Sequence, residues 1–122
     1  MRMTIENAKI ERVSISMADH GCLTFGLVLK GYGWGCTFGG YCIAHGYLGA
    51  DEDEFRAENG HGLEAMMRIM DAVGVERWED LAGKYCRVKS DGWGSVIKII
   101  GNLIDDKWFD MGAFFAEKSK GE

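Results

Sequence analysis

The side chains best suited to recognising a ligand in this 122-residue chain are aromatic and basic. The aromatic candidates are Trp34, Phe38, Tyr41 and Trp93, and the basic candidates are Arg56, Lys84, Arg87 and Lys98. A base stacking on an aromatic face contributes about 1–3 kcal/mol, and Arg or Lys pairs with phosphate through charge-assisted hydrogen bonds. These residue types therefore predict nucleotide recognition. The alternative interpretation is that the aromatics fill a core and the cations are scattered over the surface.

Catalytic motifs are missing from the sequence. It contains no Walker A loop, no GxSxG elbow, no HExxH and no complete dinucleotide fingerprint. The spacing leaves a Cys–His dyad open without favouring one. We therefore expect a binding protein and not an enzyme.

The cysteines and histidines do not form a metal-binding pattern. Cys36, Cys42 and His45 are the nearest approach to a ligand set, yet odd and even positions of one strand point to opposite faces. The four cysteines show no CxxC pair, so buried free thiols are expected. The histidines, among them His61, all adjoin glycine, which is typical of surface positions. No metal and no cofactor are predicted.

Alternating apolar and polar residues predict the strands that must position these side chains. Residues 11–17 place Arg12, Ser14 and Ser16 on the polar side, and residues 23–29 continue the period, so a hairpin is expected over 11–31. A third strand is expected over 34–44. Its glycines mark bends, or places where a ligand or another backbone comes close.

The second half of the chain predicts helices and two more strands. Residues 50–59 are expected to be an irregular acidic loop in which Asn59 caps a helix, and Leu63, Met66, Met67, Met70 and Val73 are expected to be its buried face. Gly74 ends that helix. A short helical turn at 78–81, strands over 85–89 and 95–100, and a C-terminal helix around Met111, Phe114 and Phe115 complete the order.

The predicted fold class is therefore α+β. An antiparallel sheet of about five strands carries one principal helix and a short C-terminal helix, in a single domain over residues 1–122 whose last few residues are disordered. The net charge of −5 disfavours binding to a nucleic acid polymer. No apolar run approaches the ~20 residues of a membrane span, and the polar N-terminus is not signal-like, so a cytoplasmic location is expected.

Several phrases of the sequence resemble a family of small bacteriophage proteins, the first type of Thoeris anti-defence protein. The phrases are DHGCLT at 19–24, GWGCTFGGY at 33–41, GLEAM at 62–66, VGVERWEDL at 73–81, GKY at 83–85, IIGN at 99–102 and KWF at 107–109. The resemblance extends over residues 7–115.

The resemblance implies a sponge that sequesters cyclic ADP-ribose isomers made by TIR proteins in the infected bacterial cell, without degrading them. It also implies binding of cyclic di- or trinucleotides from cGAS-like enzymes, and dimers built into hexamers. On that basis Arg56 and Lys84, with His61 nearby, are expected at the phosphates, and Trp34, Phe38, Trp93 and Asn102 at the base or ribose.

A second function class remains open. The acidic residues 51–54 fit a small phage protein that inhibits a host protein by direct binding, as nucleic-acid mimics do. A sponge predicts a concave site with cations and an aromatic ring. A mimic predicts a contiguous acidic face instead.

Overall fold

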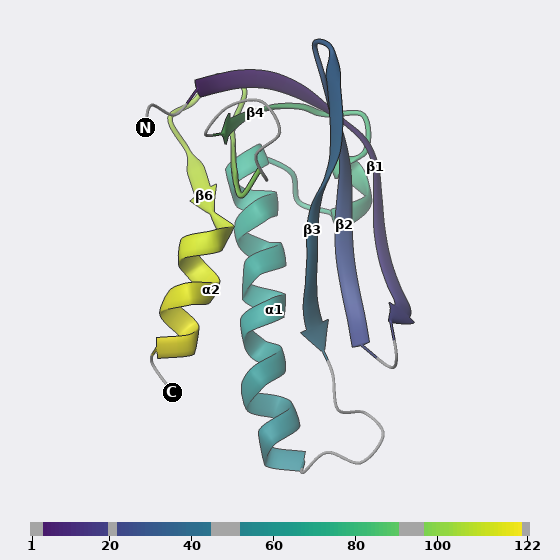
Figure 1. Ribbon diagram of the computed structural model, residues 1–122, viewed down its shortest axis with the longest axis vertical. Coiled ribbons are helices and arrows are strands. Elements are labelled where there is room, and N and C mark those ends of the chain that lie inside the picture. Colours follow the sequence, from purple (N-terminus) through teal and green to yellow (C-terminus); the bar gives the residue numbers. More distant parts are fainter. Residues whose placement is uncertain (1–3, 20–21, 45–51, 91–96, 121–122) are drawn as a thin grey trace.

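A computed structural model describes residues 4–19, 22–44, 52–90 and 97–120, with the side chains of 18–22, 40–60 and 118–120 excepted. These residues fold into strands, two α-helices and one 3₁₀ helix (Figure 1). In order they are β1 (Thr4–Asp19), β2 (Cys22–Gly31), β3 (Trp34–Ala44), α1 (Glu52–Val73), η1 (Trp78–Leu81), β4 (Tyr85–Ser90), β5 (Ile99–Gly101), β6 (Trp108–Asp110) and α2 (Met111–Lys120).

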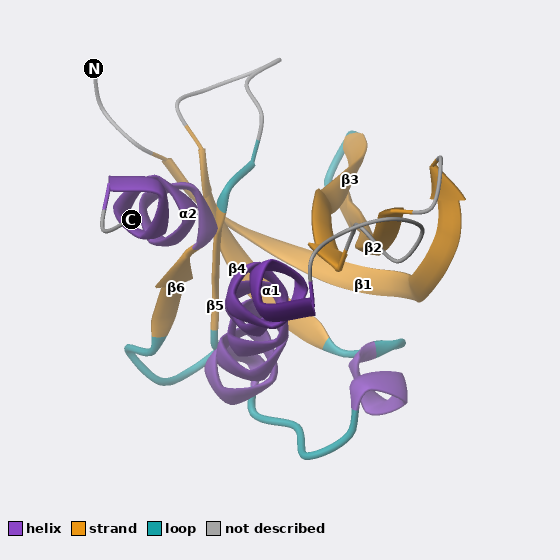
Figure 2. Cartoon of the chain, turned by 90° about the horizontal axis from the view of Figure 1, so that it is seen from below, coloured by secondary structure: helices purple, strands orange, loops and turns teal. Residues whose placement is uncertain are grey.

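The strands form one antiparallel sheet in the order β3-β2-β1-β4-β5-β6. The long strand β1 joins its two halves, because residues 4–9 pair with β4 and residues 9–19 pair with β2. An irregularity between Ile10 and Arg12 falls close to the change of partner. Bulges increase local twist, and Figure 2 shows the strong twist of the sheet between β6 and β3. The predicted α+β fold is confirmed, with a sixth strand.

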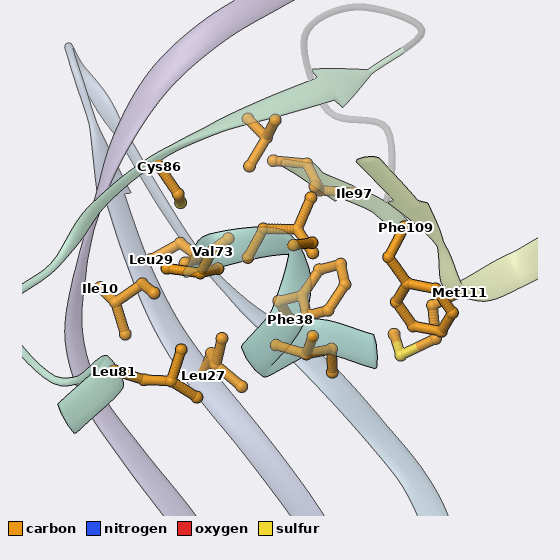
Figure 3. Packing of buried hydrophobic residues seen from close by; sticks show 14 of the residues in the cluster. Ile10, Leu27, Leu29, Phe38, Val73, Leu81, Cys86, Ile97, Phe109 and Met111 are labelled. Atoms are coloured by element: carbon orange, nitrogen blue, oxygen red, sulfur yellow. The ribbon is translucent and has the colours of Figure 1, made fainter. Parts of the chain in front are cut away.

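The core lies between one face of this sheet and the helices. Ile10, Leu27, Leu29, Phe38 and Ile100 are fully buried strand residues of this cluster. Side chains from all three helical segments, labelled as Val73, Leu81 and Met111 in Figure 3, pack against them. The helices therefore share one face, and no helix of the described residues packs on the other.

The buried face of α1 is only partly the predicted one: Val73 is buried and Met66 and Met70 pack against the core, as expected. Ala65, Ile69 and Ala72 are buried, whereas Leu63 and Met67 are 58% and 64% exposed. Small residues let the helix approach the sheet closely, so the face that packs is less hydrophobic than its neighbour. The sequence pattern is dominated by the larger apolar side chains. The face predicted from it is therefore displaced around the helix from the face that packs on the sheet.

The start of α1 is also a correction. The segment 50–59 was expected to be an irregular loop, but the helix begins at Glu52 and Asn59 lies inside it and not at its cap. Acidic residues are favoured in a first helical turn, where unpaired N–H groups carry partial positive charge, so residues 52–54 suit this position. The predicted end is confirmed: Gly74 has a φ of 97° and its N–H donates to the Met70 carbonyl.

The remaining elements largely follow the prediction. In β4, Cys86 and Val88 are buried, while Tyr85, Arg87 and Lys89 point to the opposite face. The strand expected over 95–100 is shorter, since β5 begins at Ile99 and residues 95–96 lie outside the described residues. β6 was missed because three residues are too short to show an alternation. No helix in the described ranges is long and apolar enough to cross a membrane.

Candidate functional site

The face of the sheet opposite the helices carries a group of cations. Ile10, Leu29 and Cys36 form a row across β1, β2 and β3 that faces the core. Side chains alternate between the two faces of a strand, so the neighbouring rows point away from the helices. Those two rows are Lys9, Lys30 and Gly35, and, beyond the irregularity in β1, Arg12, Val28 and Thr37.

Lys9 and Lys30 stand directly opposite each other on paired strands. Like charges in this position are destabilising, where opposite charges would contribute roughly 0.2–1 kcal/mol. The Lys9 ammonium lies 5.9 Å from the ring centroid of Tyr85, which offsets little of this repulsion. No carboxylate of the described residues forms an ion pair with Lys9, Lys30 or Arg12. A bound anion would supply the missing negative charge.

An open groove of about 700 Å³ begins at Arg12 and Lys30 and follows the β2–β3 hairpin. The residues around it are Glu11, Arg12, Val28, Leu29, Lys30, Gly31, Gly33, Trp34, Gly35, Cys36 and Thr37. Small-ligand sites usually measure about 300–1,000 Å³. The groove is therefore large enough for a nucleotide, and its cations outnumber its single carboxylate.

Glycine at position 31 makes room for the Trp34 ring, which lies on the same side of the hairpin as Leu29 and Cys36 and opposite Lys30. A Cβ atom at Gly31 would lie 2.1 Å from the Trp34 ring, so the indole occupies the space that any side chain would fill. The Trp34 Nε1–H donates to Glu6 Oε1 at 3.2 Å, which fixes the ring from its other end. Gly33 has a φ of 78°, a conformation that favours glycine, and allows the tight connection between the strands.

The thiol at the groove is poorly suited to nucleophilic chemistry. Burial raises the pKa of Cys36 above its ordinary value, which disfavours the reactive thiolate. Cys86 is buried in the core, and burial raises its pKa to about 12. Groups of His, Cys, Asp and Glu that could hold a metal ion are absent from the residues whose side chains are described. The side chains of Cys42 and His45 lie outside them. The groove thus offers positive charge for non-covalent binding.

Of the residues predicted from the sequence, Trp34 lines the groove and Phe38 does not. Phe38 is fully buried in the core, so it cannot stack on a ligand in this conformation, and its proposed contact is withdrawn. Trp93 and the side chain of Arg56 lie outside the described residues.

The other three predicted residues are not among those that line the groove. Lys84 is exposed just before β4, and His61 is half-buried on α1. The side chain of Asn102 connects the end of α1 to residues 104–105. Its Nδ2–H donates to the Val73 carbonyl at 3.0 Å, and its Oδ1 accepts from the amides of Ile104 and Asp105. These contacts give Asn102 a structural role at the end of α1.

Sequence reasoning missed Lys9, Arg12 and Lys30. Alternation placed Arg12 on the polar side of its strand, yet nothing local distinguished it from an ordinary surface cation. The missing information was the register, because only the pairing of β1 with β2 sets Lys9 against Lys30.

Comparisons with known proteins bring no further evidence on this site. No protein-family model, no curated protein and no solved structure matches the chain.

Proposed function

We propose that this protein is a phage anti-defence sponge that binds immune signalling nucleotides and holds them without degrading them. The observation that carries the proposal is the group of unpaired cations Lys9, Lys30 and Arg12 on the helix-free face, of which Lys30 and Arg12 line the groove. The resemblance of the sequence to Thoeris anti-defence proteins supports the same ligand class.

The chemistry of the groove suits a cyclic ADP-ribose isomer. Such a molecule carries a pyrophosphate with two negative charges, which two or three neighbouring cations can hold by charge-assisted hydrogen bonds. Cyclic di- and trinucleotides also combine phosphates with bases, so they are the second ligand class to test.

Self-association fits this proposal. β3 stands at one edge of the sheet and lines the groove, and edge strands expose unpaired N–H and C=O groups that a second chain can pair with. We propose a homo-oligomer, with the dimer-based hexamer of the resembled family as its expected form. Light scattering coupled to size-exclusion chromatography measures the mass, and a monomer at micromolar concentration would contradict this part.

The direct test is isothermal titration calorimetry against cyclic ADP-ribose isomers and a panel of cyclic di- and trinucleotides. The bound ligand is then released by heating and analysed by mass spectrometry. Tight binding with intact ligand supports a sponge. Altered ligand would show an enzyme, and no heat across the panel would favour a protein that blocks a host partner.

A further inference from the structure

A second group of cations lies on the same helix-free face, at the other end of the sheet. Arg87, Gly101 and Trp108 form one row across β4, β5 and β6, and Lys89 follows Arg87 on the same side of β4. A Cβ atom at Gly101 would lie 2.4 Å from the Trp108 ring, so the indole packs directly against the glycine backbone.

Arg87 and Lys89 both lie over the Trp108 ring. The Lys89 ammonium lies 4.2 Å and the Arg87 guanidinium carbon 4.7 Å from the Trp108 ring centroid. Cation–π attraction operates within about 6 Å, so the ring holds the two like charges near each other. Both side chains are only half-exposed.

The guanidinium and the indole are held in fixed positions. Arg87 Nε–H donates to the Asn102 carbonyl at 2.7 Å and Nη2–H to the Asp105 carbonyl at 2.9 Å. Trp108 Nε1–H donates to Asp106 Oδ1 at 2.8 Å. Among the described residues, the Arg87 Nη1 donors have no acceptor.

The charges of Arg87 and Lys89 are not neutralised by this arrangement. The acceptors of Arg87 are neutral carbonyl oxygens, and the Asp106 carboxylate is engaged by the indole. Within the described part of the chain, no carboxylate forms an ion pair with Arg87 or Lys89. Arg87 and Lys89 are therefore adjacent cations without a paired carboxylate among the described residues, although the protein has an excess of acidic residues. The Trp108 ring and the hydrogen bonds of Arg87 hold them in position.

We propose that Arg87 and Lys89 form a binding site for a phosphoryl group of a small ligand, separate from the groove. The Lys89 ammonium and the free Nη1 of Arg87 donate to the phosphoryl oxygens, and Trp108 sets the position of both. The site uses none of the residues of the groove, so either proposal can fail without the other.

Inorganic pyrophosphate is the probe, and the indole resonance of Trp108 in the ¹⁵N-labelled full chain is the reporter. We expect pyrophosphate to shift this resonance and the amides of residues 87–89 with saturation. Lys89→Gln should weaken the affinity by about tenfold, the loss of one charge-assisted hydrogen bond, and Lys89→Arg should restore most of it.

Lys107→Gln is the matched control, since it removes the same charge from a lysine that pairs with Asp71 at 3.5 Å. It should leave unchanged the pyrophosphate affinity that is read from the Trp108 resonance. The proposal is overturned if pyrophosphate causes no saturable shift, if sodium chloride of equal ionic strength reproduces it, or if Lys89→Gln and Lys107→Gln weaken binding equally.

Discussion

Replacing Ile69 by Ala tests how α1 lies on the sheet. Ile69 is fully buried in the core, so the substitution removes apolar contacts and leaves a cavity. Ile→Ala at such a site lowers the free energy of unfolding by about 2–5 kcal/mol. Since Ile69 lies on the helix face that meets the sheet, we expect about 3–4 kcal/mol.

Leu63→Ala is the matched comparison on the same helix. Leu63 is 58% exposed, so less than half of its side chain leaves water on folding. Complete burial of a leucine contributes about 1.5–3 kcal/mol, and the expected loss is therefore about 1 kcal/mol or less. Sequence periodicity predicts the opposite ranking, because it places Leu63 on the buried face.

Urea denaturation followed by circular dichroism measures both losses. With a slope of about 1.5 kcal/mol per molar urea, Ile69→Ala should lower the midpoint by about 2 M and Leu63→Ala by well under 1 M. A loss for Leu63→Ala equal to or larger than that for Ile69→Ala would refute the orientation of α1.

Three further predictions concern single positions. Gly31→Ala should displace the Trp34 ring and lower the free energy of unfolding in the same urea assay, whereas Gly35→Ala, whose Cβ atom would make only an ordinary contact, should not, and equal losses would contradict the packing of Trp34 on Gly31. Asn102→Ala removes three hydrogen bonds and should lower the free energy of unfolding by about 2–3 kcal/mol in the same urea assay, and a neutral result would contradict its structural role. Burial raises the pKa of Cys86 to about 12, so this thiol ionises at a lower pH in the unfolded chain than in the folded protein. The free energy of unfolding should therefore fall as the pH rises above 9. Cys86→Ala should flatten that decline by up to about 1.4 kcal/mol per pH unit, and an unchanged slope would contradict the assignment.

The fold was largely predictable from local patterns. Residues 85–89 alternate cleanly because the strand is buried on one face only, and Gly74 ends α1 by adopting the left-handed conformation that glycine favours. The helix face was not predictable in the same way. Ala65 and Ala72 are buried by close approach to the sheet, a tertiary effect that side-chain hydrophobicity does not report.

The candidate site was predictable only in part. Glycines around Trp34 indicated a place of close approach, and that residue lines the groove. Phe38 shares the same glycine-rich segment, but its position on the core face of β3 buries it. Lys9, Arg12 and Lys30 come together through strand register, which no single stretch of sequence determines.

The central claim is that Lys30 and Arg12 bind the phosphates of a signalling nucleotide. The most direct test compares the double variant Arg12→Gln with Lys30→Gln against Arg77→Gln with Lys107→Gln, which removes the same two charges from residues already paired with Glu79 and Asp71. The tightest nucleotide of the panel is titrated into both by calorimetry. We predict that the groove variant loses at least about a hundredfold in affinity, as expected for two charge-assisted contacts, while the control binds like the unmodified protein. Equal affinity of the two variants would contradict the account.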